Sequence, residues 1–311
     1  MTAPTDSAAA VYTGAVPALY LVYANAMARI RERLAQLVSY HFRRSGQWRD
    51  RDAQAFVRAI VPLVAGAQQA VSAITAGYLH DVARELTGTP SPPSGVSPSR
   101  VTGSAVRTGV DPVVVYQRPY HQVWTDLAAG TPLDEAVDKA ERRVLTIANT
   151  DLQLAKTHTA KEVFDGDKAI TYYRRIPQGP HTCAMCLIVS TRRYHKKDLA
   201  AIHPNCDCGI EQVYADVDPG PVLDEDFLNA IHDAIERDLG KDYVADSGKA
   251  GSTAKRELNY RDIIITHQHG EIGPVLGVRA HKFTGPDGIK RLNFTGPKDT
   301  QLLSHSKIPE E

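Results

Sequence analysis

Apolar residues recur every three or four positions through most of the first half of the chain. This spacing is typical of amphipathic helices, and it predicts one helix over residues 16–44 and a second over about 51–86. Asp52 suits the first turn of the second helix, and Gly88 suits its end. The connection between the two helices is short, so we expect them to form an antiparallel hairpin.

A helical pattern returns over residues 112–127 and again over 133–163. The stretch between the two helical regions differs, because residues 89–99 contain four prolines. Proline removes a backbone donor and fixes φ, so a segment this rich in proline cannot continue a helix or the interior of a sheet. We therefore predict a linker or an exposed loop here.

The pattern changes again at Ala169. Residues 169–176 are β-branched and aromatic and predict a strand, residues 193–194 predict a short strand, and residues 208–214 alternate like a returning strand. Residues 186–190 fit either a short helix or a strand. Further along, residues 223–239 predict a helix, and two Phe-Thr-Gly-Pro pieces at 283–286 and 294–297 predict a hairpin or meander.

These patterns predict an α+β protein with a mainly helical N-terminal half made of long helical hairpins. A small α+β domain and an extended C-terminal tail containing β-strands follow it. The expected divisions are a helical hairpin (1–88), a Pro- and Ser-rich linker (89–108), a helical region (109–165), a small α+β domain (166–216), and a C-terminal helix with a β-rich tail (217–311).

Composition adds little to this assignment, but the distribution of charge is uneven. Lys+Arg and Asp+Glu both number 36, so the whole chain has no field that would attract nucleic acid. Residues 1–108 nevertheless carry a net charge of +5, entirely from arginine, and the remainder carries −5. The arginine-bearing helices could contact an acidic partner or DNA, or form an ordinary solvated surface. The chain has no run of 18 apolar residues, so we expect no membrane-spanning helix.

The four cysteines of the chain lie within 26 residues, as Cys183-x-x-Cys186 and Cys206-x-Cys208, with His203 just before the second pair. Such spacing is typical of a tetrahedral zinc site, and we expect the four cysteines as ligands, with His203 as an alternate. Four protein ligands leave no open position, so this zinc ion would be structural. The alternatives are thiols that pack a compact loop, or a disulfide. A redox or cysteine-protease site is weakly indicated.

Sequence motifs for catalysis are sparse. The chain lacks the nucleophile-elbow, zinc-protease and phosphate-loop signatures. The weak catalytic candidates are His203, His267, His269 and Glu271, of which His267 and His269 would face the same side of a strand. An exposed polar strand end contains the same residue types. The residues therefore favour a protein that is not an enzyme, although they do not decide the matter.

The cysteine motif and the strand before it are similar to those of a known protein family. The sequence resembles the phage Mu F-like (MuF) minor capsid family of head morphogenesis proteins. The resemblance rests on Cys183-x-x-Cys186 and His203-Pro-Asn-Cys206-Asp-Cys208, with nineteen residues between Cys186 and Cys206, and on the preceding strand with Tyr172-Tyr173-Arg174-Arg175. The tail His269-Gly-Glu-Ile-Gly-Pro-Val-Leu276, followed by Lys282-Phe-Thr-Gly285, is similar to a branch from phages of actinobacteria whose members are commonly called capsid maturation proteases.

The resemblance implies a minor capsid protein, associated with the portal, that acts in procapsid assembly and head maturation. It implies portal, scaffold and major capsid proteins as partners and no membrane. It implies a location in the host cytoplasm during assembly and then inside the phage head. Two alternatives remain, namely a capsid maturation protease that cleaves scaffold or capsid precursor, and an internal virion protein that binds the packaged DNA.

Overall fold

The computed structural model describes most of the helical half of the chain and the strands around the cysteines. The described residues are 14–44, 46–89, 95–177, 184–202, 206, 208–214, 225, 228–229, 231, 233–234, 264–269 and 271–278. The chain divides into two compact units. The helical unit comprises Ala18–Lys168 and Gly270–Gly273. The cysteine unit comprises Met1–Pro17, Ala169–His269 and Pro274–Glu311.

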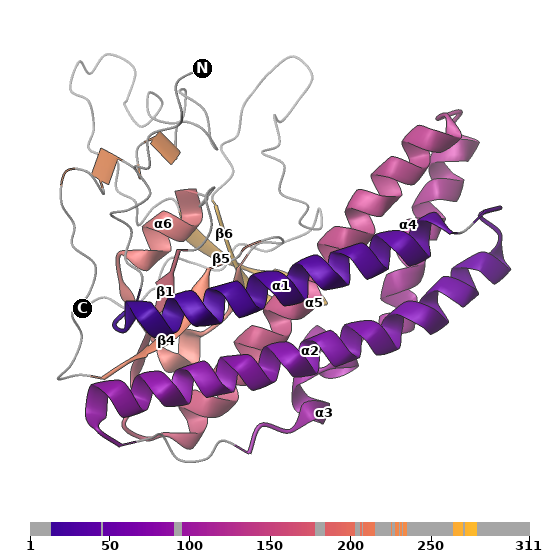
Figure 1. Cartoon of the computed structure of the whole chain (residues 1–311). Coiled ribbons are helices and arrows are strands. Elements are labelled where there is room, and N and C mark those ends of the chain that lie inside the picture. Colours follow the sequence, from indigo (N-terminus) through magenta and orange to yellow (C-terminus); the bar gives the residue numbers. More distant parts are fainter. Residues whose placement is uncertain are drawn as a thin grey trace, which may run out of the picture. The chain divides into compact units, whose positions relative to one another are not determined.

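Long helices build the helical unit, as the hydrophobic pattern predicts. They are α1 (Pro17–Arg43), α2 (Asp50–Thr87), α4 (Pro112–Ala128) and α5 (Leu133–Gly166). Helices α2, α4 and α5 pack against one another (Figure 1). Their buried faces are lined by aliphatic and small side chains at helical spacing, such as Ile60, Val64 and Val71 of α2.

Local signals set the ends of α2 and the start of α4. The side chain of Asp52 accepts a hydrogen bond from the backbone N–H of Arg49 at 3.0 Å, which satisfies a donor at the start of α2. Gly88 ends that helix in the left-handed conformation, with φ of 70°. Asp111 caps α4 by accepting from the backbone N–H of Val113 at 2.8 Å.

Aromatic side chains pack α1 against α2 and confirm the antiparallel hairpin. Near the start of α1, the ring of Tyr23 stacks on Tyr78 of α2 with centroids 4.5 Å apart. Near the end of α1, Phe42 meets Phe56 edge to face at 5.5 Å. The start of α1 therefore contacts the later part of α2, and the end of α1 contacts the start of α2. The two helices run in opposite directions (Figure 1).

The second half of the expected linker is structured. Residues 98–107 form a short helix α3 (Pro98–Val101) and a 3-10 turn η2 (Gly103–Arg107). Val101, Val106 and Arg107 are buried in the helical unit. The proline-rich part at 90–94 lies outside the described residues.

The cysteine unit contains two small sheets. The first is antiparallel, with the order β2-β1-β4, and is built from β1 (Tyr172–Ile176), β2 (Arg193–His195) and β4 (Gly209–Val213). The second has the order β3-β6-β5, from β3 (Ala201–Ile202), β5 (Ile264–His269) and β6 (Gly273–Val278), with β3 parallel to β6. Helix α6 (Ala184–Ser190) packs against β1, and it settles the ambiguous stretch at 186–190 as helical.

The strands predicted near 169–176, 193–194 and 208–214 are therefore confirmed. Most of the helix predicted over 223–239 lies outside the described residues, as do both Phe-Thr-Gly-Pro pieces. In the described part of the chain, α2 is long and apolar enough to cross a membrane on length and composition alone. Helices buried in the core of a soluble protein have the same character, so this finding is weak evidence for a membrane span.

Candidate metal centre

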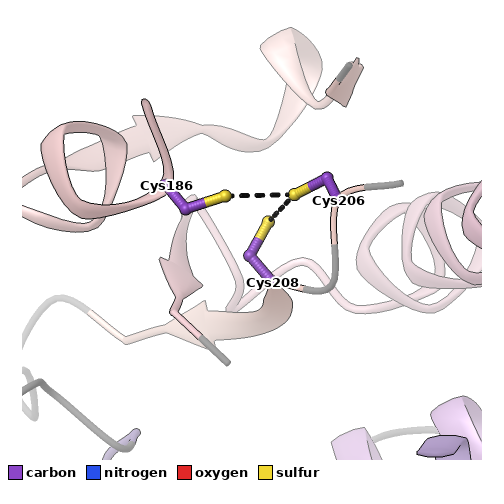
Figure 2. Close-up of side chains that lie close together, drawn as sticks. All are labelled: Cys186, Cys206 and Cys208. Carbon is purple, nitrogen blue, oxygen red and sulfur yellow. Dashed lines mark hydrogen bonds between the residues drawn. The ribbon is translucent and has the colours of Figure 1, made fainter. Parts of the chain in front are cut away.

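Three cysteine sulfurs converge in the cysteine unit. Cys186 comes from α6, whereas Cys206 and Cys208 come from the segment that leads into β4, and all three are buried. The Sγ atom of Cys206 lies 3.1 Å from that of Cys186 and 3.1 Å from that of Cys208. All three sulfurs lie within 4.8 Å of one another, and Figure 2 shows them pointing toward a common centre.

Strand β1 explains why segments twenty residues apart meet here. Helix α6 packs against β1, and β4 pairs with β1 over its whole length, from Tyr172 opposite Val213 to Ile176 opposite Gly209. The same strand therefore positions the helix that carries Cys186 and the strand that follows Cys208. Cys208 directly precedes Gly209, the first residue of β4.

The distances among the three described sulfurs exclude a disulfide between them and are compatible with a metal site. A disulfide requires about 2.05 Å between sulfurs, and the three described cysteines are free thiols. Around a tetrahedral zinc ion with Zn–S bonds of about 2.3 Å, neighbouring sulfurs lie about 3.8 Å apart. The two sulfur pairs at 3.1 Å would need to separate by about 0.7 Å to surround such an ion. Three buried thiols are therefore close enough to bind one metal.

A closed tetrahedral site needs a fourth ligand. The sequence candidates, Cys183 and the alternate His203, lie outside the described residues. Cys183 is nonetheless only three positions before Cys186, which is the usual spacing of a two-sulfur knuckle.

A buried guanidinium lies beside the sulfurs. Arg175 of β1 is fully buried, and its Nη1 lies 4.0 Å from the Sγ of Cys208. Its Nη2 donates to the backbone oxygen of Ala200, and its Cζ lies 5.7 Å from the centre of the Tyr173 ring. Burial, the largest single influence, opposes the charged form, but Cys208, Tyr173, Cys206 and Cys186 together outweigh it and raise the pKa of Arg175.

Of the four weak catalytic candidates, the structure describes the side chains of His269 and Glu271. His269 ends β5 and is half-buried, the side chain of His267 lies outside the described part, and so does His203. Glu271 belongs to the helical unit, where its two carboxylate oxygens accept hydrogen bonds from Arg107 and Arg118. Glu271 is therefore engaged in ion pairs.

The ion pairs of Glu271 belong to a larger buried network. Arg107 also donates to Asp151 at 2.6 Å, and the hydroxyl of Tyr116 donates to the other oxygen of Asp151 at 2.7 Å. Burial alone would raise the pKa of Glu271, but the hydrogen bond from Arg118 and the charge of Arg107 hold it below its ordinary value. Glu271 stays ionised at neutral pH as a result.

The sequence analysis assigned no role to Arg175, and of the members of this network it singled out only Glu271, as a weak catalytic candidate. A signal for Arg175 was available, because two consecutive arginines in an apolar strand must point to opposite faces, and both faces of β1 are covered. The network of Arg107, Asp151 and Glu271 has no such signal, since its members lie 44 and 164 positions apart.

Comparison with known proteins places the chain in a class of viral proteins. A family model described as VG15 protein matches residues 20–229, about two thirds of the chain. The chain belongs to the VG15 protein family, which is a viral family. No curated protein and no solved structure matches it.

Proposed function

We propose that this protein is a phage minor capsid protein that acts in head morphogenesis, associates with the portal and joins the procapsid during assembly. The observation that carries this proposal is the family match, which runs unbroken from α1 through the three converging cysteines. A viral family of this kind is consistent with a structural or morphogenesis role. The MuF-like cysteine motif supports the finer assignment to a minor capsid protein.

The same proposal includes a structural metal ion, and the donor chemistry favours zinc. Thiolates are soft ligands that select zinc over magnesium or calcium, and a set of cysteines with no water position is typical of structural sites. Cys186, Cys206 and Cys208 would hold the ion, with Cys183 as the fourth ligand or His203 in its place. The ion would hold α6 against the start of β4 in a unit whose sheets are small.

The test is assembly of heads from the virus's own proteins. The chain would be co-expressed with the portal, scaffold and major capsid proteins of the same virus, and heads would be isolated on a density gradient. We expect the chain to sediment with heads in a few copies each, and only when the portal is present. A cytosolic protein of equal size, expressed in place of the chain, controls for trapping.

Two results would contradict the proposal. One is a chain that stays at the top of the gradient while heads form normally. The other is a chain that enters heads in equal amount with and without the portal.

The same preparations distinguish the alternative functions. Shortened scaffold or capsid chains that disappear with His203→Ala or His269→Ala would indicate a maturation protease. Retention of the purified chain on DNA, weakening steeply with salt, would indicate an internal DNA-binding protein. Part of the arginine surface of α1 is already neutralised, since Arg43 pairs with Asp138 and Glu141.

A further inference from the structure

We infer that Arg175 compensates the negative charge of the cysteine cluster, and that it increases the affinity of the cluster for a divalent metal ion bound by thiolates. This inference rests on the metal site proposed above and assigns a positioning role to a residue outside the ligand set. Its evidence is the placement of a buried cation beside three sulfurs.

The first step is the cost of burying Arg175. Its side chain is fully buried in β1, and a buried guanidinium is costly unless a negative group or several acceptors surround it. In the described part of the chain, Arg175 forms no ion pair with an aspartate or glutamate. Its neutral contacts are the oxygen of Ala200 and the ring of Tyr173, and they do not balance a full charge.

The second step identifies the groups that can supply the opposite charge. The groups near the guanidinium that can become negative are the Cys208 thiol, which lies within 4.8 Å of the other two sulfurs, and the phenol of Tyr173. Burial raises the pKa of Tyr173 to about 12, so its phenol is neutral near pH 7. The sulfurs remain as the negative partners, and Cys208 is the nearest, at 4.0 Å.

The third step is the charge of a loaded site. A zinc ion with three thiolates carries a net charge of −1, and with four it carries −2. Because the site is buried, that excess charge is destabilising unless a cation compensates it. Arg175 supplies the cation and directs an N–H toward the sulfur of Cys208. Groups that support metal ligands in this way commonly change metal affinity by about 10- to 100-fold when they are mutated.

The neighbouring arginine provides a matched control. Arg174 is also buried in β1, but adjacent side chains of a strand point to opposite faces. Arg174 is paired in register with Glu211 of β4, on the face away from Arg175. Substitution of Arg174 therefore removes a buried arginine from the same strand without removing the cation beside the sulfurs.

The experiment measures zinc affinity by competition with a chromophoric chelator, using the full chain and its Arg175→Met, Arg175→Lys and Arg174→Met variants. Cobalt(II) substitution reports the number of bound thiolates through its sulfur-to-metal absorption band. We expect Arg175→Met to bind zinc about 10- to 100-fold more weakly than the unmodified chain. We expect Arg175→Lys to lie within tenfold of the unmodified chain, and Arg174→Met to match it.

Equal affinity of Arg175→Met and the unmodified chain would overturn the inference while leaving the metal site in place. So would an equal loss in Arg174→Met and Arg175→Met. If the unmodified chain binds neither zinc nor cobalt, the metal site itself fails and the role of Arg175 fails with it, whereas the head-assembly test still decides the minor capsid role.

If Arg175→Met does not fold, the zinc affinity of Arg175→Lys tests the inference, because lysine keeps the positive charge. An affinity within tenfold of that of the unmodified chain supports compensation by charge, and a larger loss contradicts it.

Discussion

Gly14 lies where the chain passes closest to the buried carboxylate of Glu211. The backbone N–H of Ala15 donates to Glu211 Oε1 at 2.7 Å, and Gly14 has a φ of 92°. A Cβ at position 14 would lie 2.6 Å from Glu211 Oε2, which is closer than atoms can approach. Glycine is therefore required here both by conformation and by space.

We predict that Gly14→Ala destabilises the cysteine unit by about 2–4 kcal/mol, from left-handed strain and the contact with Glu211. Gly109→Ala is the matched control, because Gly109 has the same φ of 92° but open space around it. It should cost only the strain, about 1–2 kcal/mol. Urea unfolding followed by circular dichroism measures both, and equal losses would mean that the contact with Glu211 is unimportant.

His158 of α5 is a second residue whose surroundings alter its chemistry. Burial, with a smaller effect from Lys161, lowers the pKa of His158 to about 4. Since the unfolded chain has a histidine pKa of about 6.5, the unfolded state takes up the proton first as pH falls. The neutral imidazole thus contributes stability above about pH 6.5, and that stability is lost as pH falls toward 4.

The variant His158→Gln should therefore lose less stability than the unmodified chain between pH 6.5 and 4. The difference should reach about 2–3 kcal/mol at the acidic end, because one pKa unit corresponds to about 1.4 kcal/mol. Unfolding free energies measured across this range give the two slopes. Parallel slopes would show that His158 does not titrate differently in the folded and unfolded states.

At the scale of elements, the buried charges of the helical unit join segments that are distant in sequence. Arg107 lies at the end of η2, Asp151 in the middle of α5 and Glu271 in the segment that joins β5 to β6. The hydroxyl of Thr108 adds a hydrogen bond to the backbone oxygen of Glu271 at 2.7 Å. These contacts anchor a short C-terminal segment in the helical unit.

We predict that Glu271→Gln destabilises the helical unit by about 1–3 kcal/mol, because it leaves Arg107 buried with one charged partner fewer. The pKa of Glu271 is lowered in the folded state, so its contribution is complete above the ordinary glutamate pKa, about 4.3. It is lost as pH falls through the lower folded value.

The matched control for Glu271→Gln is Asp138→Asn, which removes an ion pair of 2.6 Å with Arg43 in which both side chains are about half exposed. That change should cost less than about 1 kcal/mol. Chemical denaturation at pH 7 compares the two variants. Equal effects would show that burial adds nothing to the Glu271 ion pairs.

For the whole molecule, the cysteine cluster is the one candidate for a metal ion found among the described residues. A bound ion adds its binding free energy to the stability of the folded state, because the unfolded chain lacks the assembled site. The cysteine unit should therefore depend on metal more strongly than the helical unit does.

We predict that zinc removal by a strong chelator lowers the melting temperature of the cysteine unit and leaves the helical unit unchanged. Cys206→Ser should have the same effect, since Cys206 contacts both other sulfurs, and the chelator should then cause no further change. Calorimetry together with metal analysis by mass spectrometry tests both statements. A chelator that removes zinc without shifting any transition would contradict a structural role for the ion.

Much of the fold could be predicted from the sequence. The helices α1, α2, α4 and α5 and the strands β1 and β4 follow from local periodicity, and Gly88 ends α2 as expected. The spacing of the cysteines also predicted that Cys186 would meet Cys206 and Cys208. The packing of residues 98–107 was not predicted, because the proline-rich sequence before them indicates a loop. In the structure, Val101 and Val106 are buried in the helical unit.

The sequence by itself determined the helical hairpin, the strands around the cysteines and the grouping of the thiols, because each depends on residues close together in the chain. Only the tertiary structure decided which charges meet. Glu271 pairs with arginines more than 150 positions away. Of the two neighbouring arginines of β1, Arg175 lies beside the sulfur of Cys208, whereas Arg174 lies opposite Glu211 of β4. The physical reason is that periodicity is a local property, whereas the partner of a buried charge is set by the packing of distant segments.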